Sequence, residues 1–256
     1  MKIATWNVNS LKVRLPHVIE WLQQTGCDVL GLQELKMDNA ANAKLIAEFT
    51  TIGYNYVYNG QKTYNGVALI SKFPLEDVVL DIPHYDDIQK RVIAATINGV
   101  RIICAYFVNG ESLESAKYQY KLQWLAQLTQ YVAREIQIYP ELVLLGDYNI
   151  APEVRDTYDA NLWEGGVLCS ESERAAFNQL IALGLTDSFR HFNQEDRQYT
   201  WWDYRNMAFR RKQGLRIDHL LITPSLITRA ESCVIDTAPR KLERPSDHTP
   251  VILSIK

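Results

Sequence analysis

The hydrophobic positions of this chain form short runs, and several of these runs end in polar side chains. Residues 142–145 (Leu-Val-Leu-Leu) are the clearest run, and four consecutive apolar residues are typical of a strand buried on both faces. Asp147 and Asn149 follow Gly146, and because they are two residues apart, extended backbone points them the same way. Alone, these residues would also suit an ordinary turn, so the weight of the pattern rests on its repetition elsewhere.

The spacing of apolar residues predicts a mixed α/β protein. Helices are expected over residues 15–24, 40–49, 115–138 and 173–183. Strands are expected over residues 2–8, 27–32, 54–58, 66–71, 92–97, 100–106, 142–145, 199–203, 217–222 and 250–255, with a hairpin across Asn98-Gly99. This order predicts two mixed β-sheets packed face to face with helices outside. No linker or composition break interrupts it, so we expect one domain over residues 1–256.

Composition narrows the setting. The chain is 47% hydrophobic and 22% charged, which is typical of soluble globular proteins, and it has no apolar run of the roughly 18 residues that suggest a membrane span. The N-terminus leads directly into a strand, so we expect no secretory signal. We expect buried free thiols and a cytoplasmic protein, because the four cysteines are widely spaced among apolar neighbours: Cys27, Cys104, Cys169 and Cys233.

The polar side chains at strand ends and flanks have a chemistry in common. They are Asn7, Glu34, Tyr106, Asp147, Asn149, Asp218, Asp247 and His248. Taken singly, most of them are ordinary loop, surface or packing residues. Asp218 is harder to dismiss, because a carboxylate flanked by apolar residues needs a partner or a use. Gathered at one rim, oxygen ligands of this kind suit Mg²⁺ or Mn²⁺, and together with a histidine they suit metal-assisted phosphodiester hydrolysis.

Five motifs in order resemble the exonuclease III family, the AP endonuclease branch of the endonuclease/exonuclease/phosphatase superfamily. They are Trp6-Asn7-Val8-Asn9, Leu32-Gln33-Glu34, Leu145-Gly146-Asp147-Tyr148-Asn149, Gly214-Leu215-Arg216-Ile217-Asp218 and Ser246-Asp247-His248. The resemblance covers essentially the whole chain and implies a four-layer α/β sandwich of the DNase I-like type. The chain departs from the family pattern at Val108, where many relatives have proline.

The resemblance also implies a role for each polar residue. Glu34, with Asn7 nearby and Asp247 as a further candidate, would hold the metal. Asp147 would activate the attacking water, and Asn149 would orient Asp147 and touch the phosphate. Tyr106 would donate a hydrogen bond to the phosphate, and His248, oriented by Asp218, would stabilise the developing charge. The site near the metal would thus comprise Asn7, Glu34, Asp147, Asn149, Asp247 and His248.

Any polyanion partner must be held by local patches or by a cation, since the net charge is −3. Residues 205–216 carry five cationic side chains and no acidic one, and a second basic cluster, Arg240, Lys241 and Arg244, precedes Ser246. Although most charge runs are solvated faces, both of these flank candidate catalytic residues, which favours contact with DNA phosphates. The expected DNA contacts are Arg205, Met207, Arg210, Arg211, Lys212 and Arg216, with Met207 and Phe209 able to wedge into the duplex.

By resemblance, Trp201, Leu215 and Ile217 would line an apolar pocket for a flipped sugar that lacks its base. Whether this pocket is open depends on the loop from Trp163 to Cys169, which the sequence does not place. We therefore expect a Mg²⁺-dependent DNA-repair nuclease that cleaves 5′ to abasic sites and trims or dephosphorylates blocked 3′ ends of duplex DNA, without an obligate protein partner. The alternatives are an enzyme limited to 3′ ends and a non-catalytic DNA-binding relative.

Overall fold

Two six-stranded sheets form the centre of the structure, a computed structural model that describes residues 1–256. The first sheet has the order β11-β12-β1-β2-β4-β3. Its strands are β1 (Lys2–Asn7), β2 (Val29–Gln33), β3 (Asn55–Asn59), β4 (Val67–Ser71), β11 (Ala230–Ile235) and β12 (Val251–Ile255). The second sheet has the order β5-β6-β7-β8-β10-β9. Its strands are β5 (Glu76–Leu80), β6 (Val92–Ile97), β7 (Val100–Tyr106), β8 (Leu142–Asp147), β9 (Thr186–Asp187) and β10 (Asp218–Ile222).

The two sheets have matching topologies. Each has one parallel pair at its centre, β1 with β2 and β7 with β8, and every other pairing is antiparallel. A helix connects the two strands of each parallel pair, α1 (Leu11–Thr25) in the first sheet and α4 (Ala116–Ile138) in the second, as a parallel crossover requires. The carboxyl ends of both parallel pairs therefore carry four of the polar residues that the sequence marks out, Asn7, Glu34, Tyr106 and Asp147.

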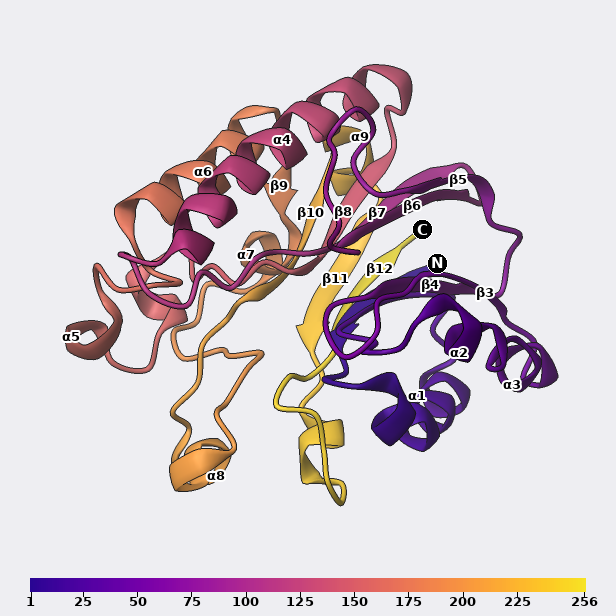
Figure 1. Ribbon diagram of the computed structural model, residues 1–256, viewed down its shortest axis with the longest axis horizontal. Helices are drawn as coiled ribbons and strands as arrows, with labels where there is room; N and C mark the ends of the chain where they lie inside the picture. The colour runs from indigo at the N-terminus through magenta and orange to yellow at the C-terminus, as the bar shows by residue number, and fades with distance from the viewer.

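Helices cover the outer face of each sheet, which gives four layers (Figure 1). The first sheet packs against α1 and α3 (Ile46–Thr51), with α2 (Asn39–Ala43) nearby. The second packs against α4 and α6 (Glu171–Ala182). The remaining helical segments are η1 (Val154–Asp156), α5 (Ala160–Trp163), α7 (Ser188–Phe192), η2 (Arg205–Met207), α8 (Ala208–Arg211), α9 (Pro224–Ile227) and η3 (Ala238–Lys241). No helix combines the length and apolar character needed to cross a bilayer.

Strand β8 shows why the apolar run is continuous. Val143 and Leu145 belong to the core between the sheets, whereas Leu142 and Leu144 belong to the core beneath α4 and α6. Because successive side chains alternate between the faces of a strand, every position of this strand is buried. The prediction of a strand buried on both faces is confirmed.

Gly31 on β2 lets the sheets approach closely at their centre. A Cβ atom at this position would lie 2.2 Å from Leu145 Cδ1 and 3.1 Å from Cys104 Sγ, both on the opposite sheet. Any larger side chain must therefore displace Leu145 or separate the sheets. All four cysteines are buried free thiols that form no disulfide, as predicted.

The predicted sandwich is confirmed, with local corrections. The aromatic segment 199–203 is not a strand, because only isolated bridges join Trp201 to Leu215 and to His248. The segment predicted as one helix over 40–49 is two short helices, α2 and α3, and helix α1 begins at Leu11 rather than Leu15. Strands β5, β9 and β11 were not predicted, and all three lie at sheet edges. Strand β5 exposes four of its five side chains, β9 has only two residues, and β11 has one buried side chain, so each carries a weak apolar signal.

Replacing Gly31 with valine should destabilise the fold by about 1–3 kcal/mol through overpacking between the sheets. Urea unfolding of Gly31→Val, of Leu145→Ala and of the double variant measures the effect. Because Leu145 Cδ1 occupies the space that the new side chain needs, the double variant should lose less than the sum of the singles, by at least about 0.5 kcal/mol. Strictly additive losses would contradict the close approach.

Candidate active site

Three polar side chains lie in one row across the second sheet. Tyr106 on β7 is the register partner of Asp147 on β8, and Asp147 is the register partner of Asp218 on β10. Gly146 permits this row, because a Cβ atom there would lie 1.8 Å from the carbonyl oxygen of Ala105 on β7. The backbones of β7 and β8 can approach only with glycine at this position.

The first sheet contributes Asn7 at the end of β1 and Glu34 directly after β2. Glu34 and Asn149 both have left-handed backbone, with φ of 54° and 48°. Such a conformation is unfavourable for a side chain like that of glutamate, and strain of this kind is found preferentially at functional sites. The turn directs Glu34 toward Asp147 on the other sheet.

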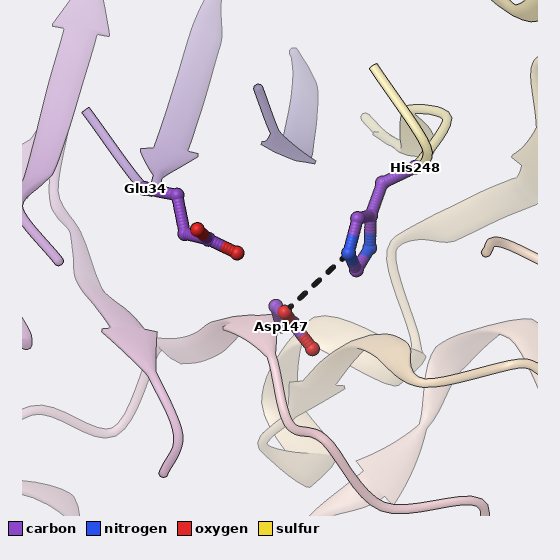
Figure 2. Close-up of side chains that lie close together, drawn as sticks. All are labelled: Glu34, Asp147 and His248. Carbon is purple, nitrogen blue, oxygen red and sulfur yellow. Dashed lines mark ion pairs between the residues drawn. The ribbon is translucent and has the colours of Figure 1, made fainter. Parts of the chain in front are cut away.

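Glu34, Asp147 and His248 lie close together, and a dashed line marks the ion pair of His248 with Asp147 (Figure 2). The amide of Asn7 donates to Glu34 Oε1 and to Asp147 Oδ2, both at 2.9 Å. His248 Nδ1 lies 2.9 Å and 3.1 Å from the two carboxylate oxygens of Asp218, and its Nε2 lies 3.7 Å from Asp147 Oδ2. The pairing of Asp218 with His248 that the sequence predicts is therefore present.

The buried charges shift one another's proton affinity. Burial would lower the pKa of His248, but the carboxylates of Asp218 and then Asp147 outweigh it and raise that pKa, so the imidazole is held as a cation. Burial raises the pKa of Asp147, against the opposing charge of His248. Burial, followed by the charges of Glu34 and Asp147, raises the pKa of Tyr106 well above its usual range. Tyr106 is thus a hydrogen-bond donor at neutral pH.

A metal ion has suitable ligands here. Glu34, Asp147 and His248 each offer one ligand atom, and these atoms lie within 4.8 Å of one another. Asp247 is not part of this group, and its oxygens accept from Asn9 Nδ2 and Trp201 Nε1, both at 3.0 Å. It lines the same cavity but is less well placed than Glu34 to share an ion with Asp147.

Glu34, Tyr106, Asp147 and His248 form the floor of a cavity of about 320 Å³, and Asn7 and Asp218 are buried behind it. Trp201 and Ile217 line its wall as the sequence predicts, and so do Trp163, Val167 and Leu168 from the loop that the sequence left unplaced. Leu215 does not line it. Leu215 is fully buried behind the wall, among Ala151, Leu168, Cys169 and Ile217, so its assignment to the pocket surface is corrected.

With this geometry in view, comparisons with known proteins are informative. The model of the Endonuclease/Exonuclease/phosphatase family matches residues 4–248. An exodeoxyribonuclease III of Haemophilus influenzae is 34% identical over the whole of both chains. The chain belongs to the exonuclease III/AP endonuclease family. It is therefore a phosphodiester hydrolase by class, and its fold is DNase I-like.

Two solved structures from the exonuclease III/AP endonuclease family match closely. A 3′ phosphatase from Neisseria, NExo, bound to a product DNA hairpin, is 49% identical with a TM-score of 0.98, covering 100% of this chain and 99% of that one. An AP endonuclease from Archaeoglobus fulgidus is 38% identical with a TM-score of 0.96, again covering 100% and 99%. The family thus includes relatives with different named activities at similar backbone geometry.

Most of the expected DNA contacts are on the surface. Arg205, Arg210, Arg211 and Lys212 are exposed, and Met207 is 57% exposed. The basic segment 205–212 forms a projection that carries α8 (Figure 1). Phe209 instead packs against Trp202, with ring centroids 5.0 Å apart.

The expected contact of Arg216 with DNA is corrected by the structure. Arg216 is 1% exposed, and its guanidinium pairs with Asp156 at 2.7 Å and with Asp187 at 2.8 Å. It also donates to Nδ1 of His219, whose pKa is lowered to about 4 by burial and then by the Arg216 charge. Arg216 is therefore a buried structural cation beneath the start of β10 and is not available to DNA.

Sequence reasoning overlooked two polar residues of the site. Asn109 lines the cavity, and its amide donates to Asn149 Oδ1 at 3.0 Å. Lys36 pairs with Glu34 at 2.9 Å. Each follows a strand end by three residues (Tyr106 and Gln33), so position after a strand was the available signal, but a loop asparagine or lysine is too common to stand out.

Replacing Asp156 with asparagine should destabilise the fold by about 3–5 kcal/mol, because Arg216 loses one of its two buried carboxylate partners and Arg190 loses its own. Arg216 and Arg190 lower the pKa of Asp156 from 3.8 to about 2, against the opposing effect of burial. This contribution is present above the unfolded pKa and disappears as the pH falls through the folded one. Urea unfolding from neutral pH downward should show the difference from wild type shrinking as the pH approaches about 2.

The matched control is Glu153→Gln, since Glu153 pairs with Arg155 but its side chain is 48% exposed. Its loss should stay below about 1 kcal/mol at every pH. A pH-independent difference between Asp156→Asn and wild type would contradict the buried ion pair.

Proposed function

We propose that this chain is a Mg²⁺-dependent DNA 3′-end phosphatase and 3′–5′ exonuclease that acts on duplex DNA. The observation that carries the proposal is the convergence of Glu34, Asp147 and His248 on the floor of a cavity with a partly apolar wall. Asn7 and Asp218 are buried behind this floor and hydrogen-bond to these three side chains. This set combines carboxylates for a hard cation with a cationic donor for a phosphate. The 49% identity to the Neisseria 3′ phosphatase supports the choice of 3′ ends.

Cleavage 5′ to an abasic site is the second candidate. It is favoured by the apolar wall of Trp163, Leu168, Trp201 and Ile217, which would suit a sugar without its base. The Archaeoglobus relative, an AP endonuclease, supports it at 38% identity. Because Trp163, Val167 and Leu168 line the same cavity as Asp147 and His248, both candidate substrates would bind in one place.

The donor set fits magnesium, with manganese as a substitute. Glu34 and Asp147 supply carboxylate oxygens, and Asn7 orients both of them. Mg²⁺ is usually held by one or two carboxylates together with water and substrate phosphate. When bound, the ion would supply Lewis-acid polarisation of the phosphate and neutralise charge. His248 serves better as a donor than as a ligand, because Asp218 holds it as a cation.

The chain's own residues divide the remaining chemistry. Asp147, whose pKa is raised by burial, accepts a proton from the attacking water or orients it. His248 and Tyr106 present N–H and O–H groups to the phosphate oxygens, where negative charge develops. The amide of Asn149 donates to Asp147 Oδ2 at 3.4 Å and to the carbonyl of Phe107 at 3.0 Å, which holds the Asp147 carboxylate in place.

The exposed basic segment 205–212 would position the duplex. Arg205, Arg210, Arg211 and Lys212 offer charge for phosphates without reading sequence. Met207, which ends η2 directly before α8 and is 57% exposed, is available to enter a groove. A segment of this kind provides the local attraction that a chain with net charge −3 needs to bind a polyanion.

The substrate test compares three duplexes that carry a 3′-phosphate, a 3′-hydroxyl end or an internal abasic site. With Mg²⁺ present, 3′-phosphate release and 3′ nucleotide removal should be detected by gel electrophoresis, and EDTA should abolish both. Glu34→Ala should weaken activation by Mg²⁺, and Asp147→Asn should lower kcat by about 100-fold or more. Hydrolysis only at the abasic site would favour the second candidate, and hydrolysis of none of the duplexes would reject the proposal.

A double-mutant cycle tests the Asp218–His248 pair. Asp218→Ala and His248→Ala should each lower kcat by about 100-fold or more, since each removes the oriented cation. Groups that act as one unit give non-additive losses, so the double variant should be little slower than the slower single. The rates are measured on the duplex that wild type hydrolyses fastest. Losses that multiply would mean that the two residues act independently.

A further inference from the structure

A buried ion pair lies behind the cavity, in a part of the molecule to which the mechanism gives no role. Lys121 of α4 pairs with Glu173 of α6, and both side chains are fully buried. The two helices lie side by side over the second sheet (Figure 1). Isolated buried charges are costly, and replacing a buried pair with apolar residues is often neutral or stabilising. A pair of this kind therefore needs an explanation beyond stability.

Lys121 uses all three of its donors. Besides Glu173, its Nζ atom donates to the backbone carbonyl of Asn149 at 2.7 Å and to that of Asn109 at 3.1 Å. An ammonium group has three donors and no acceptor. Both carbonyls belong to loops that follow strands, β8 and β7, where the ladder no longer supplies a donor. One side chain thus fixes the backbone of both loops, including Asn149 with its φ of 48°.

Glu173 holds the third loop of the cavity. Its Oε1 accepts from the backbone N–H of Leu168 at 3.0 Å, and its Oε2 accepts from Ser170 N at 3.0 Å and Ser170 Oγ at 2.6 Å. Leu168 lines the cavity, as does its neighbour Val167. Val167 in turn packs against Gly110, where a Cβ atom would lie 3.1 Å from Val167 Cγ2. The Lys121–Glu173 ion pair therefore holds the apolar wall as well as the two loops that carry Asn109 and Asn149.

We propose that Lys121 and Glu173 are positioning residues that set the distance between the 163–168 wall and the Asn109 and Asn149 loops, and so set the ranking of DNA substrates. This inference rests on the proposed function. The wall bounds the sugar end of the cavity. The phosphate end depends on the chain of amides in which Asn109 donates to Asn149 and Asn149 donates to Asp147. Because one ion pair holds both ends, disturbing it alters rate and selectivity together.

The experiment uses Lys121→Met, which removes the donors at similar length, and Glu173→Gln, which is nearly isosteric. The matched control is Glu135→Gln, which disrupts the buried pair of Arg101 and Glu135, whose closest atoms are 2.6 Å apart. Glu135 lies on the same helix as Lys121, about 21 Å further along its axis at 1.5 Å per residue. For each variant, Tm is measured first, and kcat and KM are then measured well below Tm on the three duplexes.

Lys121→Met and Glu173→Gln should lower kcat by about tenfold or more, because displacements of about 1 Å at a reacting group have effects of this size. The ratio of kcat/KM between the two fastest wild-type substrates should shift by about fivefold or more. Glu135→Gln should lower Tm but leave kcat and this ratio within about twofold of wild type, since the ion pair that it disrupts lies far from the cavity loops. This combination would support a positioning role.

If both variants at the Lys121–Glu173 pair lose only Tm, with kcat and the substrate ratio within twofold of wild type, the pair is structural and the inference is overturned. If Lys121→Met does not fold, Glu173→Gln and Lys121→Arg carry the test. Lys121→Arg keeps the charge but not the geometry. If Glu173→Gln and Lys121→Arg both leave the ratio of kcat/KM between substrates unchanged, the inference is also overturned. A wild-type chain that hydrolyses none of the duplexes overturns the proposed function as well, which distinguishes the two failures.

Discussion

The amide group of Asn7 connects the parts on which the site depends. It lies at the end of β1 in one sheet and donates to Glu34 on its own sheet and to Asp147 on the other. Two carboxylates facing each other would repel. Asn7 donates to both, and Lys36 beside Glu34 and His248 beside Asp147 supply opposing charge. The position of Asn7 requires the sheets to pack at a fixed separation. Gly31 allows this, because a side chain there would meet Leu145 of the opposite sheet, whereas Gly146 lets β7 and β8 approach within the second sheet.

The surrounding charges are arranged in two separate groups. Near the cavity, His248 lies between the carboxylates of Asp218 and Asp147. Burial raises the pKa of Asp147, and the two carboxylates raise the pKa of His248 against the effect of burial. Beneath β10, Arg216 with Asp156 and Asp187 forms a closed network away from solvent. The register of β10 separates the groups, since Asp218 and His219 point to opposite faces. One adjacent pair in the sequence thus serves the site on one face and the scaffold on the other.

The matching topology of the sheets explains why the polar residues converge. Each sheet places a parallel pair at its centre, with its crossover helix outside. Asn7 and Tyr106 end the first strands of these pairs, whereas Glu34 and Asp147 lie at the ends of the second. Packing the sheets face to face brings both sets of ends to one rim. The loops that complete the cavity are less regular, and the buried Lys121–Glu173 pair compensates by supplying backbone hydrogen bonds that no strand provides.

Local chemistry in the sequence determined the sandwich, the central strands and the polar residues at their ends, because a buried strand leaves a continuous apolar run and a buried carboxylate is conspicuous within it. It also indicated the pairing of Asp218 with His248. Tertiary structure alone decided that Arg216 is buried, since the sequence of a cationic run is the same whether its side chains face solvent or a buried carboxylate. It also decided that Leu215 lies behind the cavity wall. It also placed the loop from Trp163 to Cys169 against the site. That position depends on Glu173, Gly110 and Lys121, contacts between residues far apart in the chain that leave no periodic signal in the sequence.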